Sequence, residues 1–214
     1  MKRFAIALLC LLMLSSFSLA ADKDTPKADA SAGAHKDKKF LLDYLKKTRK
    51  DFLNSIKGLS EAQWKYKASP EHWSIAETAE HITLSEDFIR GMIQDKVMKS
   101  PEATPEQKEK ATLPDEEVIA KITDRSKKAK APEPLKPTNK WANAKEIQAE
   151  FNKRRDATVA YAKATSDTEL RNHVSQSPLG DVDGYQFLLF LSAHTKRHTL
   201  QIEEVKADPG YPRK

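Results

Sequence analysis

Three of the six histidines stand where they could bind one metal ion together. His194 and His198 are four residues apart, so on a helix both side chains lie on one face, one turn apart. His81 lies in a separate stretch with helical periodicity. Neutral imidazoles are good ligands for Zn²⁺ and its neighbours, because a ring nitrogen offers a lone pair without adding charge. Three such ligands leave a coordination position open, as is typical of a working metal site.

Each histidine also has a simpler interpretation. A single histidine on an apolar helix face is usually hydrogen-bonded within the core, and a His-x-x-x-His pair alone is weak evidence for metal. The three together favour the metal hypothesis. His35, His72 and His173 fall in a linker, before a helix and in a polar loop, and are predicted to be surface residues.

Two polar residues lie about one turn from the predicted ligands. Glu77 precedes His81 by four positions, so its carboxylate could orient that imidazole. The alternative is that Glu77 only completes a capping box with Ser74. Gln201 follows His198 by three positions on the same face and could hydrogen-bond a ligand or a substrate.

The helix that carries His81 is predicted to bury one broad face. At 100° per residue, His81 falls inside an arc of apolar residues that includes Phe88, whereas Glu80 and Thr83 fall on the opposite, polar side. The arc as a whole consists of Ile75, Ala79, Ile82, Leu84, Phe88, Ile89 and Met92.

On the last helix, His194 and His198 flank the inward stripe, and the rotation turns Lys196 and Arg197 away from the site. These two cations are therefore expected to be solvated. The stripe itself consists of Phe187, Leu191, Ile202 and Val205.

Helical periodicity recurs in four long stretches and one weaker one, and no stretch alternates as a strand would. The long helices are predicted over residues 36–56, 74–98, 143–165 and 184–207, and the weaker one over 115–128. Residues 99–114 and 131–140 hold most of the prolines and are predicted to be non-helical, and a polar loop is expected at 177–184. This predicts an all-α fold, a four-helix bundle with an additional weaker helix in the middle.

The first twenty residues have the features of a signal peptide. Lys2 and Arg3 precede an apolar run, and Ser18-Leu-Ala20 has the small-x-small pattern that signal peptidase accepts, so the mature chain is expected to begin at Ala21. The alternative, a retained anchor, would need a longer apolar run. The sequence therefore predicts a periplasmic or secreted protein, with a flexible linker at 21–35, one domain over 36–214 and no stable membrane anchor after cleavage.

Composition excludes several classes of function. The single cysteine, Cys10, lies inside the predicted signal peptide, so the mature chain has no thiol for disulfides, metal ligation or nucleophilic attack. Without Lys2 and Arg3 the 37 basic residues become 35, against 31 acidic ones, and these charges are interspersed. The basic stretches lack nearby stacking aromatics, so no nucleic-acid partner is expected. The expected partner is a small-molecule substrate, and a homodimer is compatible with the sequence.

Two motifs resemble the DinB/YfiT-like superfamily. HWSIAETAEH, residues 72–81, is similar to its second-helix motif, and SAHTKRHTLQI, residues 192–202, is similar to its C-terminal His-x-x-x-His followed by Gln-Ile. The resemblance covers roughly 36–207 and is weakest in the charged, proline-rich middle. It implies a four-helix bundle with a zinc or nickel ion on His81, His194 and His198. The family name records induction by DNA damage and implies no DNA binding.

The resemblance leaves the activity open. Some members are thiol-dependent S-transferases or isomerases, others are described as metal-dependent hydrolases, and many have no known activity. A metal-dependent enzyme of the hydrolase type is the first hypothesis, because such an ion acidifies water and polarises an electrophile. Thiol transfer ranks lower, because exported compartments are oxidising. A bundle that holds a metal or another ligand without catalysis is the remaining alternative.

Overall fold

The computed structural model describes residues 36–111 and 113–213. The predicted signal peptide (1–20) and linker (21–35), with Cys10 and His35, lie outside the described residues. Among the helices in the two described ranges, none combines the length and the apolar character that crossing a membrane requires.

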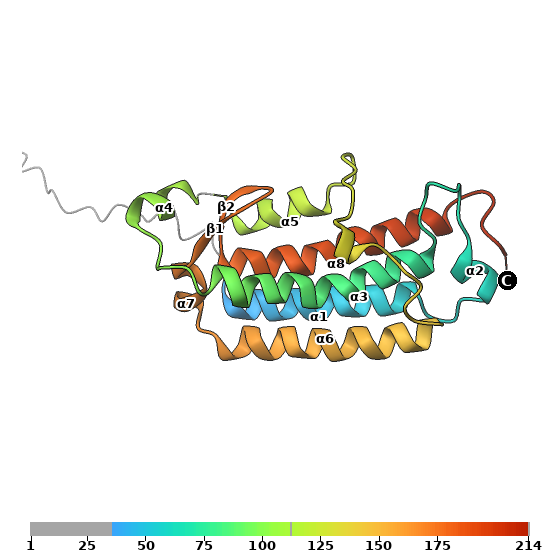
Figure 1. The fold of residues 1–214 in the computed structure, drawn as a ribbon, viewed down its shortest axis with the longest axis horizontal. Coiled ribbons are helices and arrows are strands. Elements are labelled where there is room, and N and C mark those ends of the chain that lie inside the picture. The colour runs from blue at the N-terminus through green and yellow to red at the C-terminus, as the bar shows by residue number, and fades with distance from the viewer. Residues whose placement is uncertain (1–35, 112, 214) are drawn as a thin grey trace, which may run out of the picture. The chain divides into compact units, whose positions relative to one another are not determined.

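Four long helices form the bundle (Figure 1). Helices α1 and α3 each contact both α6 and α8, so the four lie around the bundle in the order α1, α6, α3, α8. The end of α3 continues into a π-helical turn, η1 (Ile93–Val97), so this helical stretch ends near the predicted residue 98. The predicted all-α, four-helix-bundle class is confirmed. The long helices are α1 (Lys38–Ser55), α3 (Ile75–Met92), α6 (Ala144–Ala164) and α8 (Gly184–Lys206).

Side-chain caps fix where the two site-bearing helices begin. At α3, the backbone N–H of Ser74 donates to Oε2 of Glu77 (2.7 Å), and the N–H of Glu77 donates to Oγ of Ser74 (3.1 Å). Asp183 and Gln186 form the same reciprocal pair at α8. Each box satisfies two backbone N–H groups at a helix end, where such groups lack intrahelical partners.

Several shorter helices complete the chain, and some of them lie where the sequence predicts none. The weaker middle helix is present as α5, which packs on α8 and ends five residues earlier than predicted. The proline-rich stretches contain α4 and the 3₁₀ turn η2, because proline is well tolerated in the first turn of a helix. The short elements are α2 (Glu61–Lys65), α4 (Pro105–Lys110), α5 (Asp115–Thr123), η2 (Glu133–Leu135) and α7 (Asp167–Asn172).

A small antiparallel hairpin replaces most of the polar loop that the sequence predicts before α8. Its strands are β1 (Val174–Ser177) and β2 (Gly180–Asp183), with Ser177 opposite Gly180. The hydroxyl of Ser177 donates to the carbonyl of Gly180 (2.8 Å) and accepts from the N–H of Leu179 (3.0 Å). Gly180 has a φ of 99°, a conformation that favours glycine. Four-residue strands are too short to show a clear alternation, which explains why the sequence pattern missed them.

A buried ion pair lies in the core and joins all four long helices. Arg155 of α6 is fully buried and donates to the carboxylate of Glu86 on α3, with Nε 3.0 Å from Oε2. Its guanidinium also donates to the Leu45 carbonyl and the Thr48 hydroxyl on α1 and to the Thr195 hydroxyl on α8, each at 2.8 Å. The network satisfies the buried guanidinium and holds the helices in one register.

Candidate metal centre

Helices α3 and α8 lie side by side (Figure 1). They bring His81, His194 and His198 together. One potential ligand atom from each ring lies within 4.8 Å of those of the other two. The ring centroid of His81 is 5.1 Å from that of His194 and 4.5 Å from that of His198. His81 is buried, whereas the two rings on α8 are partly exposed. The cluster therefore lies between the buried interior at α3 and the partly exposed residues of α8.

Hydrogen bonds fix the tautomers of two of the three rings. Nδ1 of His81 donates to the backbone carbonyl of Leu135 (2.8 Å), and Nδ1 of His198 donates to Oε1 of Gln201 (2.8 Å). Both partners are acceptor oxygens, so each Nδ1 carries the proton. Nε2 of both rings is then left with a free lone pair, which is the state that a metal ligand needs.

Burial keeps the three imidazoles neutral. It lowers the pKa of His81, and it lowers that of His198 to about 3 with help from the neighbouring His81 ring. Burial, followed by the positive charge that His198 and His81 would carry, holds the pKa of His194 well below the usual 6.5. A neutral ring keeps one nitrogen lone pair beside its single N–H, whereas a protonated ring has none.

Aromatic rings flank the cluster. The Trp73 ring is tilted against His81, with centroids 4.9 Å apart, and the Phe190 ring stacks nearly parallel to His194 at 6.3 Å. Both aromatic side chains are partly exposed. They therefore place apolar ring surface directly against two of the three imidazoles.

Residues 44–202 match the family model described as the DinB superfamily, and this range contains all three histidines and Gln201. The chain belongs to the DinB superfamily. The chain is also similar to the uncharacterized protein YuaE of Bacillus subtilis (strain 168), with 24% identity over 165 residues, which cover 77% of this chain and 96% of YuaE.

The fold is also similar to that of a solved structure. YfiT from Bacillus subtilis matches with a TM-score of 0.54 and 12% identity, over 82% of this chain and 89% of YfiT. YfiT is described as a probable metal-dependent hydrolase with an unusual four-helix bundle topology. At this identity the likeness concerns the fold alone.

Glu77 of this DinB-superfamily chain serves the helix cap and not the cluster. Its carboxylate accepts from the backbone N–H of Ser74 and from Nζ of Lys67 (3.1 Å). Of the two interpretations of Glu77, the structure therefore supports the capping box. The oxygen that orients His81 is instead the Leu135 carbonyl, which is 54 residues away in sequence and belongs to η2.

A second glutamate, Glu80, binds the segment that follows Leu135. The sequence predicts Glu80 and Thr83 on the polar face of the helix, but both are buried. The Glu80 carboxylate accepts from the backbone N–H groups of Thr138 (2.8 Å) and Lys140 (3.2 Å) and so ties the segment after η2 to α3. Both predictions failed because α3 is covered by η2 as well as by α6 and α8. Conversely, Phe88 is exposed although the predicted arc included it.

The remaining described histidines lie outside the cluster. His72 is exposed, as predicted, and its Nδ1 is hydrogen-bonded to the hydroxyl of Ser69 (2.8 Å). His173 is buried, which contradicts the predicted surface position. It lies between α7 and β1, two elements that the sequence pattern does not reveal, and its carbonyl accepts from the N–H of Gly184.

Arg197 is likewise not the solvated side chain that the sequence predicts. Its guanidinium donates to the carbonyls of Ile122 (3.1 Å), Asp124 and Lys127 (2.5 Å). Because α5 packs against α8, this arginine faces the end of α5 and fastens the following residues to α8. Lys196 points to a different neighbour, with Nζ 3.5 Å from Oδ2 of Asp51.

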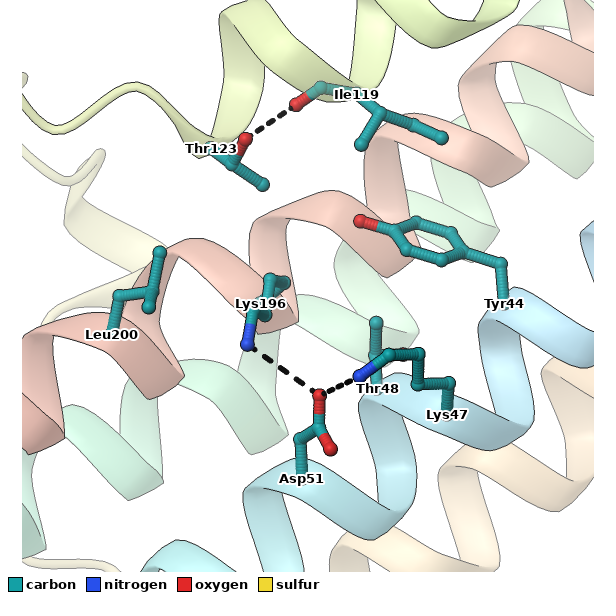
Figure 2. A pocket seen from close by; sticks show the side chains of 8 residues that line it. All are labelled: Tyr44, Lys47, Thr48, Asp51, Ile119, Thr123, Lys196 and Leu200. Carbon is teal, nitrogen blue, oxygen red and sulfur yellow. Dashed lines mark hydrogen bonds and ion pairs between the residues drawn. The ribbon is translucent and has the colours of Figure 1, made fainter.

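A small hollow separate from the histidine cluster lies between α1, α5 and α8 (Figure 2). Its lining is mostly apolar, with Tyr44 and Ile119 on the walls. Asp51 stands at its edge, where Lys47 (2.8 Å) and Lys196 pair with the carboxylate. None of the lining residues belongs to the histidine cluster.

Proposed function

We propose that this DinB-superfamily protein binds one divalent metal ion through His81, His194 and His198 and acts on a small molecule as a hydrolase-type enzyme. The observation that carries the proposal is the convergence of three neutral imidazoles, two of them with Nδ1 already engaged. Imidazole donors suit zinc and nickel among the divalent ions. The description of YfiT as a probable metal-dependent hydrolase supports the same function.

The donor set fits such an ion. A tetrahedral zinc ion with Zn–N bonds of ~2.0–2.1 Å needs its donor nitrogens about 3.3 Å apart. The ligand atoms, within 4.8 Å of one another, can reach that separation by small side-chain rotations. When bound, the ion would supply Lewis-acid chemistry at its open position.

The chain's own residues then have defined tasks. The Leu135 carbonyl and the Gln201 amide hold two imidazoles in the ligating tautomer. Trp73 and Phe190 shield the rings on one side. The partial exposure of His194 and His198 leaves a route by which a small substrate reaches the centre.

A non-catalytic metal-binding bundle is the second candidate. The hydrogen bonds of Glu77 favour it. The sequence offers this carboxylate as an outer partner of His81, but both of its oxygens are engaged away from the cluster. A thiol-dependent S-transferase remains the third, and the oxidising compartment expected for an exported protein disfavours it.

Metal analysis paired with a substrate screen tests the proposal. The purified protein should contain, or take up on reconstitution, about one zinc or nickel ion per chain. It should hydrolyse a member of a panel of esters, amides and thiol adducts, losing this activity with a chelator and regaining it with metal. Stripping the ion should also lower stability, by about 2.7 kcal/mol if the free ion had been at 100 times its Kd. Metal without turnover would support the non-catalytic bundle, and failure to bind either ion would refute the proposal.

We also propose that the protein is exported, on the sequence pattern of residues 1–20. N-terminal sequencing of the periplasmic and secreted fractions should show chains that begin at Ala21. Intact Met1 on most molecules would contradict export.

A further inference from the structure

The connection between α5 and α6, residues 124–143, reaches the histidine cluster from both sides. On the α3 side, its Leu135 carbonyl accepts from His81. On the α8 side, the guanidinium of Arg125 lies 3.4 Å from Oε1 of Gln201, the same oxygen that accepts from His198. This one connection therefore contacts His81 directly and His198 through Gln201.

Arg125 is held firmly in this position. Its Nε and Nη2 donate to the two carboxylate oxygens of Glu204, at 2.5 and 2.6 Å. Such a two-point pair fixes the plane of the guanidinium as well as its place. The remaining nitrogen, Nη1, is left to face Gln201.

The orientation of the Gln201 amide matters because its two ends have opposite hydrogen-bonding roles. Oε1 only accepts hydrogen bonds and Nε2 only donates them. Arg125 presents a donor, so it favours the orientation with Oε1 toward it, and that same oxygen then requires the proton of His198 on Nδ1. With the amide reversed, its NH₂ group would face the guanidinium and would favour a bare Nδ1 on His198. The proton would then sit on Nε2 and block the lone pair needed for a metal.

We propose that Arg125 is a positioning residue of the metal centre, which sets the ligating tautomer of His198 by orienting the Gln201 amide. This inference rests on the metal-binding function proposed above. It also gives the charged, proline-rich middle of the chain a role in the site, through a residue that is not itself a candidate ligand.

Positioning and simple electrostatics predict opposite effects for the loss of Arg125. A nearby cation repels a divalent ion, and without it the Glu204 carboxylate would be unpaired. On charge alone, Arg125→Met should therefore strengthen metal binding. If Arg125 orients the amide, the same substitution should weaken binding, because part of the population adopts the tautomer that cannot ligate.

The first test measures zinc and nickel affinity by competition with a chromophoric chelator, with folding checked by circular dichroism. Arg125→Met should bind zinc or nickel about tenfold more weakly than the unaltered protein. This factor lies in the range observed when a metal ligand loses a residue that hydrogen-bonds to it. Arg197→Met is the matched control, because Arg197 fastens the same connection to α8 but makes no hydrogen bond to Gln201. It should bind as well as the unaltered protein or better. Unchanged or tighter binding by Arg125→Met would overturn the inference.

The second test uses Gln201→Glu, whose two carboxylate oxygens both accept, so that no reversed orientation exists. In this background Arg125→Met should cause no loss of affinity. A tenfold loss there as well would show that Arg125 acts by some other route and would overturn the amide mechanism.

The third test separates this inference from the metal proposal, because it needs no metal. Nitrogen-15 NMR of the metal-free protein should show His198 protonated on Nδ1, and Arg125→Met should shift it toward a mixture of tautomers. An unchanged tautomer in the variant would refute the inference, whether or not the unaltered protein binds zinc. Absence of binding by the unaltered protein would refute only the proposed function.

Discussion

Each of the single substitutions His81→Ala, His194→Ala and His198→Ala should abolish tight binding of zinc or nickel. Every one of these substitutions removes a donor from a set of three that converge on one point. The loss should exceed the 10–100-fold that changes in outer partners of a ligand cost. Isothermal titration of the metal-free variants, with circular dichroism to show that they fold, measures the effect.

His72→Ala is the matched control for this series. His72 precedes the same helix as His81, but it is exposed and bonded to Ser69. Its loss should leave the metal affinity nearly unchanged. If the three cluster variants bound zinc or nickel as tightly as His72→Ala, the metal hypothesis would be refuted. The histidines would then be packing residues in the α3–α8 contact.

Arg155→Met should strongly destabilise the core. It leaves the Glu86 carboxylate buried with its main charge partner gone, and breaking a buried pair in this way costs about 3–5 kcal/mol. It also removes donors from Leu45, Thr48 and Thr195, so contacts among all four long helices weaken together. Urea denaturation followed by circular dichroism gives the free energy of unfolding.

Asp156→Asn, one position along, serves as the surface control. Asp156 is largely exposed and pairs with Arg49, so its loss should cost less than about 1 kcal/mol. The double variant Arg155→Met with Glu86→Leu should regain much of the lost stability, since it leaves no buried charge unpaired. A cost below about 1 kcal/mol for Arg155→Met alone would contradict the central role of the pair.

The long helices were predictable because their signals are local. The capping box of α3 needs only Ser74 and Glu77, which are three residues apart. The apolar spacing of α8 repeats every three or four residues along one helix. Both predicted helices are present. The hairpin and α7 depend instead on distant partners: Arg171 of α7 donates to Asp115 and Asp183, which come from two other parts of the chain. No pattern within a short window could reveal such contacts.

The cluster itself was predictable for a related reason. A four-residue spacing fixes the relation of His194 to His198, and the apolar arc of α3 turns His81 inward. Its outer partners were only half predictable. Gln201 is three residues from His198, whereas Leu135 contributes a backbone carbonyl, and a backbone carbonyl has no residue type to recognise. Glu80 was misplaced because a rotation of 100° per residue assumes one buried face, and α3 has neighbours on several.

The α5–α6 connection lies in sequence between α3, which carries His81, and α8, which carries His194 and His198. A cut at its exposed Lys128 would leave His81 on one fragment and both histidines of α8 on the other. Neither fragment would hold more than two of the three donors, and the helix contacts α1–α8 and α3–α8 would have to form between separate molecules. An ion that requires all three rings would bind only the reassembled pair and so favour it by mass action. The fold thus offers a place to split the protein into halves whose reunion reports on metal concentration.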